Sequence, residues 1–293
     1  MSLARIAPAL FAFLWSTGWI AAKFGAGVAG PMTFLSVRFA AAAVLMFALC
    51  RLQNVRFPRN GTLLIRSLLS GALLHGLYLG AVWWAIAQGV PANLSGVIAA
   101  LQPLLTAALA VCLIREKLSR RQVAGLLLGF AGVALAVVPS VLGSDLASVL
   151  GLAVLINILG MVSVSFGTIY QKQNLGGHDL RVVVTYQYVG ALAVTLPFAC
   201  LLETWEIEFG WIFWSVMAWS VVASSIVGVL LLLYLLRQGQ ASKAAALVYL
   251  VPALTALQAL IAFREVPSLP MVIGAGITIL GVYLTSRSRL ESA

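Results

Sequence analysis

The sequence is poor in charge. Only 9% of its 293 residues are charged, whereas 62% are hydrophobic. An ordinary soluble domain carries roughly 25% charged residues, and no soluble fold could bury this much apolar surface. Apolar stretches of about 20 residues, long enough to cross a bilayer, recur almost from end to end. We therefore expect an all-α integral membrane protein whose main partner is the lipid bilayer.

Acidic residues are especially scarce, with 8 in the whole chain. All of them fall in predicted loops or at the ends of apolar segments. A membrane-embedded enzyme would need paired carboxylates or a His-Glu-x-x-His cluster inside the membrane, and the sequence contains neither. We expect no catalytic residues, no metal site and no cofactor, and a membrane enzyme stays a distant alternative. The acidic residues are Glu116, Asp145, Asp179, Glu203, Glu206, Glu208, Glu265 and Glu291.

Two further absences narrow the function. No filter-like loop or ring of charge is visible, which argues against a channel. The 3 cysteines, Cys50, Cys112 and Cys200, stand in or beside apolar segments without metal-ligand spacing. We interpret them as small core residues.

The net charge of +10 has two explanations. A basic chain can bind nucleic acid, but in so apolar a chain we interpret the charges as those that orient the spans, because cytoplasmic loops are rich in Lys and Arg. With the N-terminus in the cytoplasm, only Lys23 and Arg264 of the 18 basic residues fall outside, and Arg38 is embedded. The sequence thus predicts cytoplasmic termini, a bacterial-type inner (plasma) membrane and no nucleic-acid partner.

Apolar runs separated by charged, Gly or Pro residues predict ten transmembrane helices. Their connections are too short for a soluble domain on either side. The predicted ranges are 3–22, 31–51, 62–87, 91–112, 119–139, 148–170, 179–201, 211–236, 240–262 and 268–287.

The second half of the chain repeats the first at one offset, 149 residues, the separation of Pro103 and Pro252. Five helices per repeat is an odd number, so the second copy must enter the membrane from the opposite face. We predict two inverted five-helix repeats, residues 1–142 and 143–293, a plan typical of secondary transporters. The matched pairs are Pro103 with Pro252, Thr106 with Thr255, Arg115 with Arg264, Glu116 with Glu265, Gly125 with Gly274 and Gly132 with Gly281.

Three segments carry a family resemblance. They are Leu14-Trp15-Ser16-Thr17, Pro103-Leu104-Leu105-Thr106 with the Arg115-Glu116 that follows, and the repeated segment from Pro252 to Glu265. With them the chain resembles the EamA-type members of the drug/metabolite transporter superfamily over essentially its whole length, and within that superfamily it is similar to the YddG-type amino-acid exporters. The resemblance implies two EamA-type repeats and export of small metabolites.

The matched prolines indicate where a substrate would bind. Proline inside a helix removes a backbone hydrogen bond, and matched interruptions in two halves are a pointer to a transporter site. Pro103 and Pro252 could instead merely bend two packing helices. Their symmetry favours a shared central cavity, which we expect the first, third, fourth, sixth, eighth and ninth helices to bound.

Polar and aromatic residues near mid-span are candidates for the cavity wall. His75 and Tyr78 share a helix face, although His75 could equally be a satisfied core histidine. Trp15 could line the cavity or anchor at the interface, where tryptophan is enriched. Buried amides are costly in lipid, so they should face protein or water. The predicted substrate-binding residues are Trp15, His75, Tyr78, Gln102, Ser163, Tyr249 and Gln258.

Two other patterns are interpreted as structural. Glycines 125, 129, 132, 274 and 281 recur at helical spacing and should let helices approach closely. The Arg-Glu pairs at residues 115–116 and 264–265 lie at helix ends, where we expect local charge pairing that orders each turn.

The predicted cavity is nearly neutral and aromatic. A phosphorylated substrate would need several buried cations, and only Arg38 is well embedded. We expect a secondary transporter that exports neutral or zwitterionic metabolites, most of all amino acids, aromatic ones included; drugs or other uncharged metabolites are the alternative. No carboxylate lies at mid-depth, so we hypothesise export without obligatory proton coupling. The oligomeric state stays open, and a monomer is compatible with the sequence.

Overall fold

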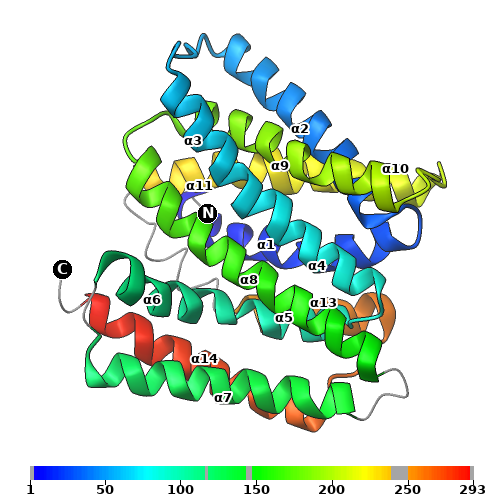
Figure 1. Ribbon diagram of the computed structural model, residues 1–293, viewed down its shortest axis with the longest axis vertical. Coiled ribbons are helices and arrows are strands. Elements are labelled where there is room, and N and C mark those ends of the chain that lie inside the picture. Colours follow the sequence, from blue (N-terminus) through cyan, green and yellow to red (C-terminus); the bar gives the residue numbers. More distant parts are fainter. Residues whose placement is uncertain (1–2, 116–117, 143–146, 239–249, 291–293) are drawn as a thin grey trace.

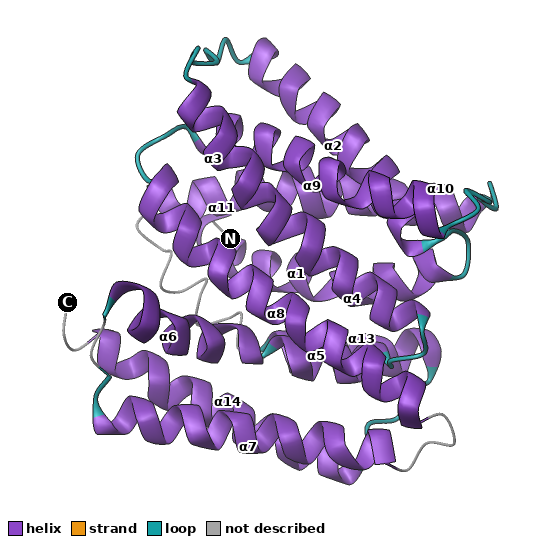
Figure 2. Cartoon of the chain, in the orientation of Figure 1, coloured by secondary structure: helices purple, strands orange, loops and turns teal. Residues whose placement is uncertain are grey.

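The structure is a computed structural model that describes residues 3–115, 118–142, 147–238 and 250–290. The described residues are helical, without strands, and form one bundle of long helices (Figures 1 and 2). The helices are α1 (Leu3–Ala26), α2 (Pro31–Leu52), α3 (Gly61–Gly71), η1 (Ala72–Leu77), α4 (Tyr78–Ala87), α5 (Ala92–Ala99), α6 (Leu101–Ile114), α7 (Arg120–Leu142), α8 (Ala147–Leu175), α9 (Leu180–Leu202), α10 (Trp211–Ala218), η2 (Trp219–Val227), α11 (Gly228–Arg237), α13 (Val251–Phe263) and α14 (Leu269–Leu290).

Eight helical segments of the described chain are long and apolar enough to cross a membrane. They coincide with the first eight predicted helices. Two further apolar helices, Val251–Phe263 and Leu269–Thr285, are shorter. Residues 240–249, the first part of the ninth predicted helix, lie outside the described residues. The all-helical membrane fold is therefore confirmed, and the count of ten spans stays a prediction.

The third and eighth predicted helices are not continuous α-helices. Each contains a π-helical segment, η1 in the third and η2 in the eighth. A π-helix bonds residue i to i+5 and is usually found at functional sites. At the start of η1, α3 presses against α9 so closely that a Cβ on Gly71 would overlap the backbone of Gln187. No pattern in the local sequence predicted this irregularity.

The fourth predicted helix is broken, as its proline suggested. It divides at Ala100 into α5 and α6, and Pro103 lies in the first turn of α6. Pro252 likewise lies in the first turn of α13. Proline is well tolerated there because the first turn of a helix has no intrahelical partner for its N–H groups. Pro103 thus begins a helix beside a break rather than kinking a continuous one, and Pro252 stands at the start of α13.

The last helices of the two predicted repeats, α7 and α14, lie side by side along their length (Figure 1). A Cβ on Gly132 would lie 2.6 Å from the carbonyl oxygen of Gly274. A Cβ on Gly281 would lie 2.5 Å from the amide nitrogen of Gly129. The prediction that these glycines form a packing surface is confirmed, because backbone meets backbone and no side chain fits between.

A carboxylate joins helices at the end of α1. Glu265 forms an ion pair with Lys23 of α1. It also accepts hydrogen bonds from the backbone N–H groups of Ala92 and Asn93, at 3.3 and 3.2 Å, at the start of α5. These N–H groups have no partner inside their own helix, and a negative charge is favourable there. The expected local pairing of Arg264 with Glu265 is therefore wrong: the charge acts between helices. Glu116 lies outside the described residues.

Candidate substrate site

A small cavity lies between α1, α5, α6, α13 and α14. Its volume is about 30 Å³. The lining residues are Trp15, Trp19, Gly96, Ala99, Ala100, Gln102, Pro103, Val251, Pro252, Ile279 and Val282.

Four of the predicted residues meet at this cavity. Trp15, Gln102, Pro103 and Pro252 come from α1, α6 and α13. The lining matches three of the six helices expected around the cavity, the first, fourth and ninth. It also includes Ile279 and Val282 of α14. We did not expect α14 at this cavity. The close contact of α14 with α7 brings it there.

Gln258 and Ser163 lie against neighbouring helices. The Nε2 group of Gln258 donates a hydrogen bond of 2.8 Å to the hydroxyl of Ser16 in α1, while its Oε1 is buried without a partner. The hydroxyl of Ser163 donates a bond of 2.9 Å to the carbonyl oxygen of Leu73, inside η1. Ser163 thus stabilises the irregular segment. Tyr249, the remaining predicted residue on the ninth helix, lies outside the described residues.

His75 and Tyr78 belong to a second group, which we call the Arg38 cluster. Its members are Arg38 and Phe39 of α2, His75 of η1, Tyr78 of α4, Tyr188 of α9 and Ser225 of η2. The ring centroid of His75 lies 5.4 Å from that of Tyr188 and 6.3 Å from that of Phe39. Gln187 is within hydrogen-bonding reach of His75. None of these residues lines the small cavity.

Arg38 is the charged centre of this cluster. It is only 8% exposed, and its guanidinium carbon lies 5.8 Å from the ring centroid of Phe39. Its Nη2 donates a hydrogen bond of 3.3 Å to the hydroxyl of Ser225, whose own carbonyl oxygen accepts a bond of 2.8 Å from the Tyr188 hydroxyl. Its Nε is enclosed and has no partner. Among the described residues no carboxylate pairs with this guanidinium.

A larger apolar cavity, of about 260 Å³, lies between α1 and the α10/η2 segment. Its lining includes Phe24, Trp211 and Trp219, and the Trp219 indole donates a bond of 2.9 Å to the hydroxyl of Thr17. Trp211 is 78% exposed, in keeping with its predicted place in an interfacial aromatic belt.

Comparison with protein families decides the identity. The model of the EamA-like transporter family matches the chain twice, at residues 4–138 and at residues 151–287. The chain belongs to this family. It is a multi-pass membrane protein, and its family points to a transporter rather than an enzyme.

Several relatives of this EamA protein carry transporter names. It is 26% identical to the uncharacterized transporter YvbV of Bacillus subtilis, over 97% of this chain and 92% of that protein. It is 30% identical to the uncharacterized inner membrane transporter YedA of Escherichia coli, over 55% of this chain and 51% of YedA. A WAT1-related chloroplastic protein of Arabidopsis thaliana is 24% identical over 94% of this chain and 67% of its own length.

A solved crystal structure has the same fold. It superposes with a TM-score of 0.64 and covers 99% of each chain, at 20% sequence identity. At that identity the likeness concerns the fold of this EamA protein alone.

Sequence reasoning did not select two residues that the structure brings to the centre of the EamA fold. The sequence indicates that Arg38 is embedded in a span, but neither Arg38 nor Tyr188 is among the residues that we predicted to bind substrate. Tyr188 stands among many apolar neighbours. A signal for Arg38 was present, because a charged residue well inside a span is a functional candidate by default. Nothing in the sequence links Tyr188 to it, since α2 and α9 are far apart in the chain.

Proposed function

We propose that this EamA protein is a secondary transporter that exports small neutral or zwitterionic metabolites by alternating access, and that amino acids, aromatic ones included, are its substrates. The observation that carries the proposal is that helix irregularities recur in both halves at one offset. Shifting η1 by the offset of Pro103 and Pro252 places it within η2. Two equivalent halves that can exchange conformations are the requirement for alternating access.

Contacts between α7 and α14 support the inverted arrangement. Gly125 approaches Gly281, and Gly132 approaches Gly274, although the repeat pairs Gly125 with Gly274 and Gly132 with Gly281. Such a reciprocal contact, in which each partner meets the other's equivalent, is the mark of a two-fold axis. Thr278 donates a bond of 3.4 Å to the carbonyl oxygen of Gly129, its own repeat equivalent, as expected at the axis.

The double family match, at 4–138 and 151–287, supports the same architecture. We propose two inverted five-helix repeats with a boundary near residue 142, ten spans in total, and both termini in the cytoplasm of a bacterial inner membrane. The left-handed backbone of Arg115 (φ 53°) and Arg264 (φ 56°), which ends α6 and α13, fits this repeat.

The chemistry of the two residue groups supports the substrate class. Trp15 at the small cavity and Tyr78 in the Arg38 cluster offer apolar faces with polar tips, which suits aromatic or bulky side chains. Arg38 is the one buried guanidinium among the described residues, too few cations for a phosphorylated substrate. The proposed site therefore comprises Trp15, His75, Tyr78, Gln102, Ser163, Tyr249 and Gln258, beside the helix starts at Pro103 and Pro252.

Proteoliposomes test the function. Vesicles that contain the purified protein are loaded with labelled amino acids, and efflux is measured with and without unlabelled competitors. Efflux of one or more amino acids, inhibited by that amino acid outside, is expected. Efflux of uncharged drugs but of no amino acid would favour the alternative, an exporter of drugs or uncharged metabolites. No efflux of either class would contradict the proposal.

Cysteine labelling tests the location. In a variant without Cys50, Cys112 and Cys200, single cysteines at positions 102 and 258 should react with aqueous maleimides during transport, whereas a cysteine at the exposed position 261 should not. Equal reactivity at all three positions would place the substrate path elsewhere.

A further inference from the structure

We propose that Arg38 binds the carboxylate of the transported substrate, so that a single carboxylate group is the feature that this transporter requires. The proposal deepens the proposed function and rests on it. It assigns to Arg38 a role that the described lining of the small cavity does not supply, because the described residues around that cavity are apolar, aromatic or amide side chains without a positive charge.

The guanidinium of Arg38 donates fewer hydrogen bonds to the described residues than it can. Arginine has five N–H donors, and the described residues accept one hydrogen bond from Arg38, at Ser225, with a distance of 3.3 Å at the long end of the usual range. The Nε–H has no partner although it is fully enclosed. A buried charge without a counter-ion is costly, and a carboxylate can accept two parallel bonds from the guanidinium and remove that cost.

Among the described residues, no acidic side chain serves as the counter-ion of Arg38. Of the acidic residues that the structure describes, Glu265 pairs with Lys23, Asp179 pairs with Arg181, and Glu203 accepts from the backbone at the start of α2. Glu206 and Glu208 are exposed in the segment between α9 and α10. Each of these carboxylates lies at a helix end or in a connecting segment, whereas Arg38 lies within a span.

The guanidinium is held next to the irregular segment η2. Its one acceptor among the described residues, Ser225, belongs to η2. The ring of Tyr188, which is bonded to the same serine, lies tilted beside that of His75 in η1, with 5.4 Å between the centroids. The hydroxyls of Ser220 and Ser224, also in η2, are buried without a partner. Arg38 therefore lies between η1 and η2. The unpaired hydroxyls of η2 are further groups that can donate hydrogen bonds to a carboxylate.

The position equivalent to Arg38 in the other half of the chain is neutral. It is Gln187, whose Nε2 donates hydrogen bonds of 2.9 Å to the hydroxyl of Ser70 and to Oε1 of Gln171. Only one of the two equivalent positions carries a charge, so the site matches one negative group. A zwitterionic amino acid or a monocarboxylate meets this requirement, whereas a phosphate ester or a plain amine does not.

Three probes that differ by one group each test the proposal on the wild-type protein. They are L-phenylalanine, phenylpropionate, which lacks the ammonium group, and phenethylamine, which lacks the carboxylate. Binding to purified protein in nanodiscs is followed by the rise in melting temperature and by titration. L-Phenylalanine and phenylpropionate should bind, and phenethylamine should not.

Variants then assign the effect to Arg38. Arg38→Met should weaken binding of both carboxylates about 10- to 100-fold, as loss of a charge-assisted hydrogen bond does, and Arg38→Lys should give an intermediate loss. Arg59→Met, an exposed arginine outside the spans, is the matched control and should bind normally. Without ligand, Arg38→Met should melt at or above the wild-type temperature, because it removes an unpaired buried charge. A purely structural arginine would instead lower the melting temperature on removal.

The outcomes separate this inference from the proposed function. Binding of phenylpropionate alone, lost in Arg38→Met, would keep the carboxylate site and remove the amino-acid assignment. Equal binding of L-phenylalanine and phenethylamine, or unchanged affinity in Arg38→Met, would overturn the carboxylate site and leave amino-acid export standing. Binding of none of the three probes would overturn both.

Discussion

Where α7 meets α14, glycine lets one backbone lie directly against another; where α2 and α9 meet η1 and η2, polar and aromatic side chains fill the space. The first region consists of regular helices, with the Thr278 hydroxyl bonded to backbone oxygens only. The second contains two π-helical segments, a buried guanidinium and several hydroxyls without partners. Close backbone packing holds two helices in one arrangement, whereas unsatisfied polar groups leave room for another partner.

The difference assigns separate tasks to the two regions. We interpret the α7/α14 seam, defined by glycines 125, 129, 132, 274 and 281, as a fixed joint between the halves. The Arg38 cluster is then the region that exchanges one set of contacts for another during transport. Variants in the seam should affect folding, and variants in the cluster should affect transport.

The largest effect on stability is expected in the seam. In Gly281→Val the new side chain would collide with the backbone of α7, because even its Cβ would lie 2.5 Å from the Gly129 nitrogen. Overpacking costs about 1–3 kcal/mol, and more where backbone must move, so we expect little folded protein by size-exclusion chromatography. Gly276→Val, on an exposed position of the same helix with nothing within 4 Å, is the control. Equal folding of both variants would contradict the interpretation of the α7/α14 seam as a fixed joint.

The largest effect on transport without loss of folding is expected for aromatic residues. Trp15→Ala and Tyr78→Ala combined should reduce efflux of the preferred amino acid at least about tenfold, since each removes a large contact surface. Trp214→Ala, at a side chain that is 60% exposed, should leave efflux unchanged. Full transport of every amino acid by the double variant would contradict the proposed substrate site.

An intermediate effect on stability is expected at the carboxylate that joins helices. Glu265→Gln removes the ion pair with Lys23 and weakens the bonds to the start of α5, which should cost about 1–3 kcal/mol because the carboxylate is largely enclosed. A lower melting temperature than that of the exposed control Glu206→Gln is expected. An unchanged melting temperature would mean that α1 and α5 are held by apolar packing alone.

Proton-driven transporters commonly carry the coupling proton on a carboxylate inside the membrane. In this protein His75 is the residue to compare with such a carboxylate. His75 contacts Phe39 and Tyr188 and no acidic side chain of the described residues, so we do not expect it to carry a proton. Efflux down a substrate gradient should persist without a pH difference and after a protonophore is added. Uphill accumulation driven by a pH gradient alone, and abolished by His75→Ala, would show the opposite.

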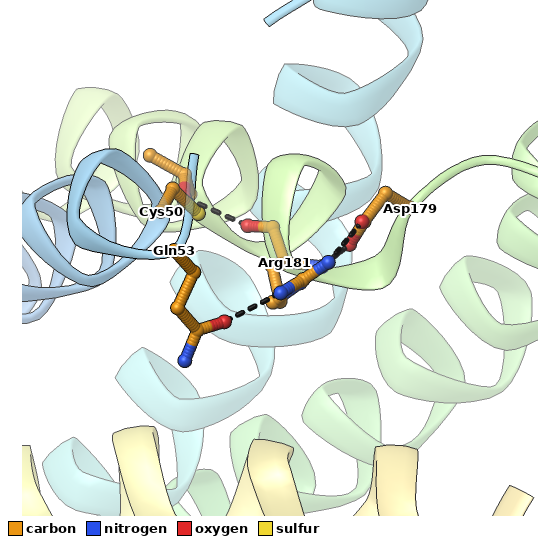
Figure 3. A network of polar contacts seen from close by, with 5 residues as sticks. Cys50, Gln53, Asp179 and Arg181 are labelled. Atoms are coloured by element: carbon orange, nitrogen blue, oxygen red, sulfur yellow. Dashed lines mark hydrogen bonds and ion pairs between the residues drawn. The ribbon is translucent and has the colours of Figure 1, made fainter. Parts of the chain in front are cut away.

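The smallest effect is expected at the polar contacts near the start of α9 (Figure 3). Asp179 accepts from the backbone N–H of Arg181 at 2.9 Å and pairs with its guanidinium, which also reaches Gln53 after α2. Arg181→Ala should change stability by less than about 1 kcal/mol, because ion pairs near the surface are worth little. Chemical denaturation in detergent measures it. A loss as large as that of Glu265→Gln would show that this end of the molecule is also held by charge.

The sequence by itself determined that the chain lies in lipid as helices, and it predicted the repeat. Hydropathy and the scarcity of charge determine that most of the chain lies in lipid, and in lipid the backbone must bond to itself, which leaves helices as the local solution. The constant offset from Pro103 to Pro252 indicates the two halves. Glycine spacing was enough to predict the seam, because a glycine stripe on a helix is a local pattern.

The tertiary structure alone decided which residues meet. The π-helical segments interrupt the third and eighth predicted helices, the partner of Glu265 is a lysine on α1, and the surroundings of Arg38 come from helices distant in sequence. These features depend on contacts across long loops of chain, and no periodicity within one segment contains them. The structure places the predicted binding residues in two groups, one at the small cavity and one around Arg38. Residues at the same depth in the membrane need not lie on the same face of the bundle, so the sequence alone did not separate them.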